Sequence, residues 1–220
     1  MENLFNDFKE SIFNEETKSV MTDYAEWGID SILKDKRCEE IPILKTLLAF
    51  CRVATNIREC NLMKQTYNFI KDFNEHANTE NVSRHREELN NNKNKLEEEL
   101  ERVLTLLDRN YEVSKTRLLA LLYAAYVNRR ISWDEFCEFS DIVNRMFVSD
   151  LSTLRDTFAN DGVTDSSIMS HRHDRLISLG LLRNQQALGG QILMSIEGAD
   201  RDVYIGITDI GRLFCEIIFN

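Results

Sequence analysis

The scarcity of helix-breaking residues constrains the fold of this chain more than any other feature. Its 220 residues include a single proline, Pro42, and eight glycines, and both residue types destabilise the interior of a helix. Seven of those glycines lie after position 160, so we expect strands and tight turns to be concentrated there. The sequence therefore predicts a mainly α-helical protein, with a helical domain over residues 1–128 and a second domain over residues 129–220 that contains one β-hairpin.

Apolar residues recur at helical intervals through the first domain. They predict one or two amphipathic helices between residues 6 and 33, and one or two more after Pro42, which stands where a helix can begin. Residues 118–127 are apolar on nearly all sides, which is typical of a central buried helix. A further apolar seam is too short for a coiled coil and predicts a helical hairpin within the chain, with "NNNKNK" as its loop; the seam consists of Leu89, Leu96, Leu100, Val103 and Leu107.

Two helix starts carry side chains suited to capping. Ser114 is expected to cap the central buried helix, and Ser132 with Glu135 three residues later matches a capping box. The helix after Ser132 has one apolar face, which we assign to Phe136, Val143 and Phe147.

Most of the chain is acidic, with a net charge of −10, but residues 41–71 carry five basic residues and one acidic residue. A basic amphipathic helix can lie on a membrane surface, so a membrane-surface or toxin-like role for residues 41–71 is one hypothesis. Amphipathic helices mostly cover protein cores, however. We therefore expect this segment to pack within the protein, with its charges solvated or paired with the acidic N-terminal segment.

Cysteine usage and hydropathy favour a cytoplasmic protein. The five cysteines are odd in number and show no Cys-x-x-Cys spacing, which predicts free thiols in a reducing cytosol. The N-terminal residues lack the positive and apolar regions of a secretory signal. No uncharged apolar run reaches the roughly 18 residues that a membrane-spanning helix needs, so integral insertion is not expected.

The last seventy residues follow the order helix, helix, hairpin, helix. A short helix from residue 150 ends before Gly162, and a second spans residues 164–180, with Thr164 or Asp165 as its cap and Gly180 as a left-handed terminator. Thr208 is expected to cap the last helix. Alternating apolar residues place one arm of the hairpin at Ile192, Met194 and Ile196, and the other at Val203, Ile205 and Ile207.

The segment "RLISLGLLR", followed by a hairpin and "YIGITDIGRLF", resembles the recognition helix and wing of winged-helix regulators of the MarR and PadR type. The resemblance covers about 45 residues closely and implies that residues 129–220 form a winged helix-turn-helix domain. The first half of the chain resembles uncharacterised bacterial proteins in the helix that begins "PILKT" at Pro42, and we transfer no function from this resemblance. The winged-helix pattern consists of Leu176, Gly180, Leu181, Leu182, Ile207, Thr208 and Gly211.

The resemblance raises the question of DNA binding, because the second helix of such a domain enters the major groove and the wing contacts phosphates. The expected hairpin tip, "EGADRD", carries three carboxylates against one arginine and would repel a phosphate chain. Asp165 and Asp174 also offset the arginines of the helix. A DNA-binding transcriptional regulator is therefore the alternative hypothesis, and its contact residues would be His171, Arg172, Arg175, Arg183 and Arg201.

We expect instead a non-enzymatic bacterial protein that acts through protein contacts, with a protein partner or as a homodimer. The last helix has more apolar surface than such a small module usually covers. Its expected interface residues are Ile210, Leu213, Phe214, Ile217 and Ile218.

No motif indicates catalysis, a cofactor or a metal. The chain has no phosphate-binding glycine loop, no His-Glu-x-x-His and no Gly-x-Ser-x-Gly. His171 and His173 lie about 200° apart around a helix, so they do not share a metal easily, and His173 is expected to be a half-buried structural residue. Acidic runs such as "EEELE" at residues 97–101 are interpreted as solvated helix faces.

Overall fold

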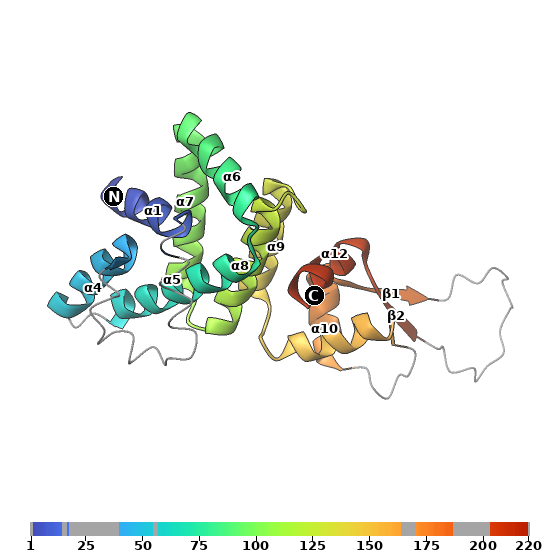
Figure 1. Ribbon diagram of the computed structural model, residues 1–220. Helices are drawn as coiled ribbons and strands as arrows, with labels where there is room; N and C mark the ends of the chain where they lie inside the picture. Colours follow the sequence, from blue (N-terminus) through green and yellow to red (C-terminus); the bar gives the residue numbers. More distant parts are fainter. Residues whose placement is uncertain are drawn as a thin grey trace, which may run out of the picture. The chain divides into compact units, whose positions relative to one another are not determined.

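A computed structural model describes residues 2–14, 17, 40–54, 57–163, 170–186 and 203–219. Within these ranges the protein is mainly helical and contains a small two-stranded antiparallel sheet, as the sequence predicts (Figure 1). It divides into two compact units, Met1–Ser140 and Asp141–Asn220. The sequence-based boundary lies at residue 128.

Helices make up the first unit. Two of them, α5 and α8, pack along each other and form its centre. Residues 118–127 of α8 are buried almost throughout, which confirms the expected central helix. The helices are α1 (Glu2–Ile12), α4 (Pro42–Ala54), α5 (Ile57–His76), α6 (Thr79–Asn91), α7 (Lys93–Arg109), α8 (Val113–Val127) and most of α9 (Trp133–Arg145).

Aromatic side chains fill the centre of this unit. The ring of Tyr123 in α8 lies 5.8 Å from that of Phe69 and 5.5 Å from that of Phe73, both in α5, measured between ring centroids. Phe8 of α1 approaches Phe69 at 6.2 Å. All four side chains are at most 1% exposed, and burying each stabilises the fold by on the order of 2 kcal/mol.

The predicted helical hairpin is formed by α6 and α7, but its loop is far shorter than expected. Only Asn92 separates the two helices, so most of "NNNKNK" is helical. This single residue has extended backbone angles and caps both helices: its N–H donates to the carbonyl of Leu89, and its side chain accepts from the N–H of Lys95 at 3.1 Å.

Three of the predicted helix starts are confirmed and one is wrong. Helix α4 begins at Pro42, and Ser132 and Glu135 form the predicted capping box: Ser132 N–H donates to Glu135 Oε2 at 2.6 Å, and Glu135 N–H donates to Ser132 Oγ at 3.2 Å. The third, Thr208, is described with the second unit. Ser114 was the wrong cap, because α8 begins at Val113 and the carbonyl of the preceding Glu112 accepts from the N–H groups of Lys115 and Thr116.

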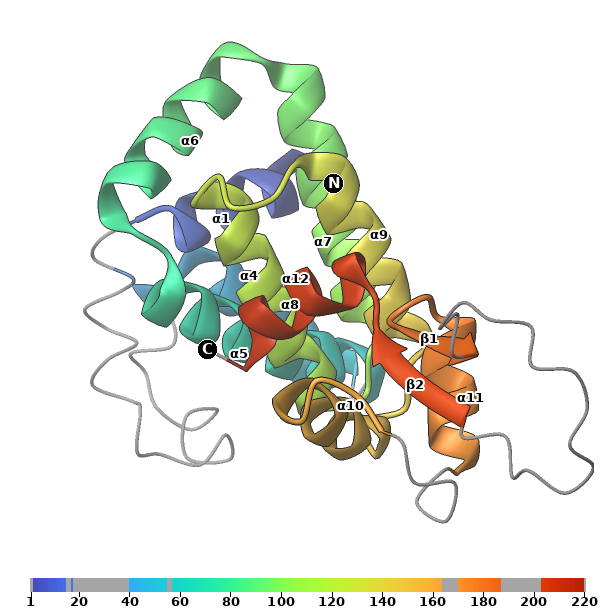
Figure 2. The same ribbon diagram turned by 90° about the vertical axis from the view of Figure 1, so that its right-hand side faces the viewer.

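In its described residues the second unit combines the end of α9 and three further helices with the sheet (Figure 2). Strands β1 and β2 pair antiparallel in the register Leu182↔Ile207, and Val163 makes an isolated antiparallel bridge to Ile205. Helix α11 lies against β1, and α10 contacts β2, α11 and α12. These elements are α10 (Asp150–Ala159), α11 (His171–Ser178), β1 (Leu182–Gln186), β2 (Val203–Ile207) and α12 (Asp209–Ile218).

The hairpin prediction was correct for β2 and wrong for its partner. The strand that pairs with residues 203–207 is Leu182–Gln186, and the expected arm at Ile192, Met194 and Ile196 lies outside the described residues. The sequence of β1, "LRNQQ", is polar after its first residue. Hydrophobic alternation therefore gave no strand signal there.

A tight junction joins α11, β1 and α12. Gly180 has a φ of +77° and ends α11 in the left-handed conformation, as predicted. Thr208 caps α12 by accepting from Gly211 N–H at 2.9 Å, and its own N–H donates to Leu181 O at 3.1 Å. A Cβ at Gly211 would lie 2.0 Å from Leu181 O, so only glycine permits this approach. The expected caps Thr164 and Asp165 lie outside the described residues.

Two further expectations concern the cysteines and the membrane. Cys60 is disulfide-bonded, which contradicts the expectation of a free thiol at that position, while Cys137 and Cys215 are not in disulfides. None of the helices in the described ranges combines the length and hydropathy that a bilayer crossing requires.

Candidate functional site

The five cationic residues proposed for DNA contact have different environments. His171 and Arg183 are exposed, at the start of α11 and on β1 respectively. Arg172 is partly exposed and donates through Nη1 to Ser152 Oγ at 3.4 Å. Arg175 is engaged by an acidic residue of the same unit, and Arg201 lies outside the described residues.

Arg175 forms a bidentate ion pair with Asp150, the first residue of α10. Its Nε donates to Asp150 Oδ2 at 2.9 Å, and its Nη2 donates to Asp150 Oδ1. The carboxylate is fully buried, whereas the arginine side chain is 33% exposed. The hydrogen bond from the guanidinium to Asp150 raises the pKa of Arg175 above its usual value. A buried carboxylate requires such a partner, so this arginine ties α11 to α10.

The same guanidinium lies over an exposed aromatic ring. The Cζ atom of Arg175 is 4.9 Å from the centroid of Phe147, whose side chain is 59% exposed. The sequence had placed Phe147 on an apolar face of the preceding helix with Phe136 and Val143. That helix ends at Arg145, and of the three only Phe136 and Val143 are buried. Asp150, Arg175 and Phe147 together are called the aromatic–arginine cluster below.

The structure places most of the expected interface residues of α12 in the interior. Phe214, Ile217 and Ile218 are at most 9% exposed, so they are covered by this chain itself. Ile210 and Leu213 are partly exposed.

His173 is a buried structural residue. Its side chain is 3% exposed, and its Nδ1 accepts a hydrogen bond from the N–H of Ser170 at 3.2 Å, which closes the start of α11. Burial lowers the pKa of His173 despite the opposing charge of Asp174. Among the described residues, no group of three or more His, Cys, Asp or Glu side chains is arranged to hold a metal ion.

A second polar site lies in the first unit and is centred on Glu99 of α7. This carboxylate is 1% exposed and accepts hydrogen bonds from Tyr126 OH at 2.6 Å and from Tyr123 OH at 3.2 Å. His85 Nε2 lies 2.9 Å from Glu99 Oε2, and Lys95 Nζ lies 3.8 Å from Oε1. Burial, followed by the interaction with Glu99, raises the pKa of both tyrosines, so both phenols stay protonated as donors.

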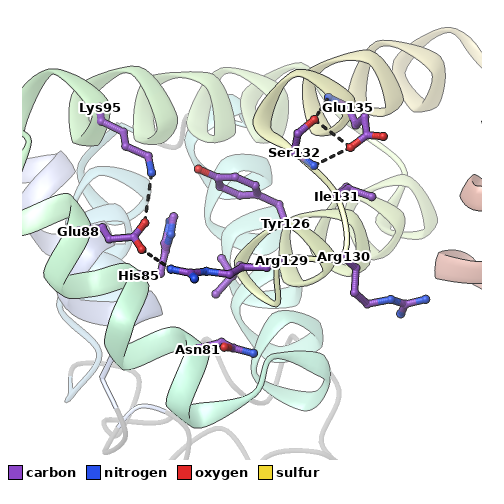
Figure 3. A pocket seen from close by; sticks show the side chains of 11 residues that line it. Asn81, His85, Glu88, Lys95, Tyr126, Arg129, Arg130, Ile131, Ser132 and Glu135 are labelled. Carbon is purple, nitrogen blue, oxygen red and sulfur yellow. Dashed lines mark hydrogen bonds and ion pairs between the residues drawn. The ribbon is translucent and has the colours of Figure 1, made fainter.

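A pocket of about 510 Å³ opens beside this network (Figure 3). Glu88 of α6 lines the pocket and contacts two cations: Arg129 Nη2 donates to Glu88 Oε1 at 2.5 Å, and Lys95 Nζ lies 3.5 Å from Glu88 Oε2. Hydrogen bonding to Arg129 and the charge of Lys95 lower the pKa of Glu88, against the effect of burial. His85 and Tyr126 also line the pocket, so the buried network reaches its wall.

The burial of Glu99 corrects the interpretation of "EEELE" as a solvated face. Glu97, Glu98 and Glu101 are exposed, but Glu99 is not. One signal in the sequence does distinguish it: Glu99 lies three residues after Leu96 and four before Val103, on the apolar seam of α7. A carboxylate on this face of the helix is buried by the same packing that buries its apolar neighbours.

Comparison of the chain with protein-family models, with curated proteins and with solved structures gives no match. Function is therefore inferred from the geometry of the aromatic–arginine cluster and of the pocket beside Glu99.

Proposed function

We propose that this chain is a non-enzymatic regulatory or adaptor protein whose second unit is a winged-helix module that acts through protein contacts. The observation that carries the proposal is the aromatic–arginine cluster. Phe147 is 59% exposed and lies beneath an arginine that Asp150 holds in place. Arginine and aromatic side chains that are already ordered lose little entropy on binding and dominate many protein interfaces.

The order of elements supports a winged-helix module. Helix α10, helix α11, the paired strands β1 and β2, and helix α12 follow one another in the order helix, helix, hairpin, helix that the resemblance implies. The glycine-ended α11 and the Thr208 cap of α12 occupy the positions that the MarR and PadR pattern assigns to them.

Charge favours a protein partner over DNA. Residues 150–220 contain ten acidic and six basic residues, and Arg175 is committed to Asp150. An arginine whose charge is neutralised by a buried carboxylate contributes little to the release of counterions on which DNA affinity depends. Because His171 and Arg183 are exposed, a DNA-binding regulator is the alternative function.

The membrane-surface hypothesis for residues 41–71 has less support. The apolar side chains Leu44, Leu47 and Leu48 of α4 are at most 4% exposed, and Arg58 pairs with Asp108 of α7. The face that would enter a lipid surface thus lies in the core of the first unit.

Site-specific photo-crosslinking tests the protein-contact proposal. A p-benzoylphenylalanine at position 147 is expected to give a discrete adduct in cells that express the protein, and the mass of the adduct distinguishes a homodimer from another partner. The matched control is the same group at Tyr111, which is 82% exposed in the other unit. Absence of an adduct at position 147, or equal labelling at both positions, contradicts the proposal.

A further inference from the structure

The pocket beside Glu99 has no role in the proposal above, yet it has the size of a ligand site. Its volume of about 510 Å³ falls within the range of small-molecule sites, which is on the order of 300–1,000 Å³. Its walls come from α6, α7, the end of α8, the turn that follows it and the start of α9, all within the first unit.

Several of the hydrogen-bonding groups left in this pocket are donors. Both oxygens of Glu88 are engaged, by Arg129 and by Lys95, and Glu135 Oε2 accepts from the N–H and the hydroxyl of Ser132. Within the described part of the chain, Arg129 donates to Glu88 through Nη2, which leaves its Nε–H and Nη1–H groups for a ligand.

The charges of the lining residues also favour an anionic ligand. Three cations, Lys95, Arg129 and Arg130, line the pocket together with two carboxylates, Glu88 and Glu135. This local excess of positive charge stands in a chain whose net charge is −10. Figure 3 shows Arg129 extended across the pocket toward Glu88 and His85, whereas Arg130 points away from them. Arg129 and Lys95 are thus the two cations that converge.

The backbone of Arg129 is a second, independent observation. Its φ is +63°, the left-handed conformation that glycine adopts without strain at the end of a helix. Arginine at this position ends α8 at a conformational cost, and strained residues of this kind cluster at functional sites. Because arginine and not glycine occupies this position, a guanidinium lies at the pocket.

We propose that this pocket binds a small ligand through a phosphate or carboxylate group, which accepts hydrogen bonds from Arg129 and Lys95. A guanidinium presents parallel N–H groups that match the oxygens of such an anion. Glu88 holds the two cations together when the ligand is absent. Glu99 does not line the pocket, and its oxygens contact Tyr126 OH and His85 Nε2.

The variant Arg129→Gly tests the proposal without endangering the fold. Glycine is favoured at a positive φ, so this change removes the guanidinium while keeping the end of α8. Lys95→Gln is a second variant at the site. Arg84→Gln is the matched charge control, because Arg84 lies on α6, pairs with Glu80 and does not line the pocket.

The measurement is an NMR titration of the full-length protein with inorganic phosphate, AMP, citrate and, at matched ionic strength, chloride. We expect saturable shifts at pocket residues with at least one oxyanion and none with chloride. Affinity should fall at least tenfold in Arg129→Gly and in Lys95→Gln, and less than twofold in Arg84→Gln.

The three oxyanions also separate the sources of the anion. Tighter binding of AMP than of inorganic phosphate assigns the site to an organic phosphate, equal binding assigns it to a free oxyanion, and preference for citrate assigns it to a carboxylate. Absence of saturable shifts with all three, or wild-type affinity in both pocket variants, overturns the proposal.

Discussion

Arg175 of α11 and Asp150 of α10 lie 25 residues apart in sequence and form a bidentate ion pair, with the carboxylate fully buried and the guanidinium one-third exposed. The pair aligns the two helices and holds the guanidinium over Phe147. It therefore links the stability of the second unit to the surface that we propose for partner binding.

The unequal exposure of this pair predicts unequal mutational effects. Arg175→Met leaves a buried carboxylate without a partner and should lower the free energy of unfolding by more than Asp150→Asn does. Asp150→Asn leaves a guanidinium that water can still reach and should cost about 1–2 kcal/mol. Urea denaturation followed by circular dichroism measures both. Arg172→Met serves as the control, with a change below about 0.5 kcal/mol. Equal losses in the two main variants would argue against this account.

The tyrosine hydroxyls on Glu99 should also differ in importance. Tyr126 OH donates to Glu99 Oε1 at 2.6 Å, and Lys95 Nζ lies 3.8 Å from the same oxygen. Tyr123 OH donates to Oε2 at the longer distance of 3.2 Å, and His85 also contacts Oε2. Tyr126→Phe should therefore cost about 1.5–3 kcal/mol, as expected for a hydrogen bond to a charged group, and Tyr123→Phe less. Chemical denaturation tests the order, and a larger loss in Tyr123→Phe would contradict it.

His173 predicts a dependence of stability on pH. Because its pKa is lowered in the folded protein, unfolding takes up a proton in the interval between the folded pKa and the ordinary value near 6.5. Its contribution to stability is complete above that ordinary value and is lost as the pH falls through the folded pKa. Thermal unfolding between pH 7.5 and 5 should show a smaller decrease in Tm for His173→Leu than for the wild type. Parallel curves for the two proteins would exclude His173 as the source.

The charge of the second unit predicts weak DNA binding. In fluorescence anisotropy with mixed-sequence duplex DNA at about 150 mM salt, we expect no binding tighter than the non-specific range of about 10⁻⁴–10⁻⁶ M. The control is the double variant Arg172→Ala with Arg183→Ala, which should behave like the wild type. Tighter binding with a steep salt dependence, lost in that variant, would instead support the DNA-binding regulator.

Features that depend on a few neighbouring residues could be predicted from the sequence. The buried helix over residues 118–127, the capping box at Ser132 and Glu135, the turn at Gly180 and the cap at Thr208 were all predicted correctly. Helical periodicity, capping and a positive φ are set by contacts within about four residues, so the local sequence is sufficient for them.

Tertiary structure decided the features that depend on contacts between residues far apart in the sequence. His85 and Tyr126 reach Glu99 across 14 and 27 positions, and β2 pairs with the polar strand β1, which has no apolar alternation to reveal it. A buried carboxylate is stable only where donors from other elements converge on it, and their convergence depends on how the helices pack. The sequence by itself therefore determined most of the helices and several of their ends, while the packing of those helices created the pocket beside Glu99 and the aromatic–arginine cluster.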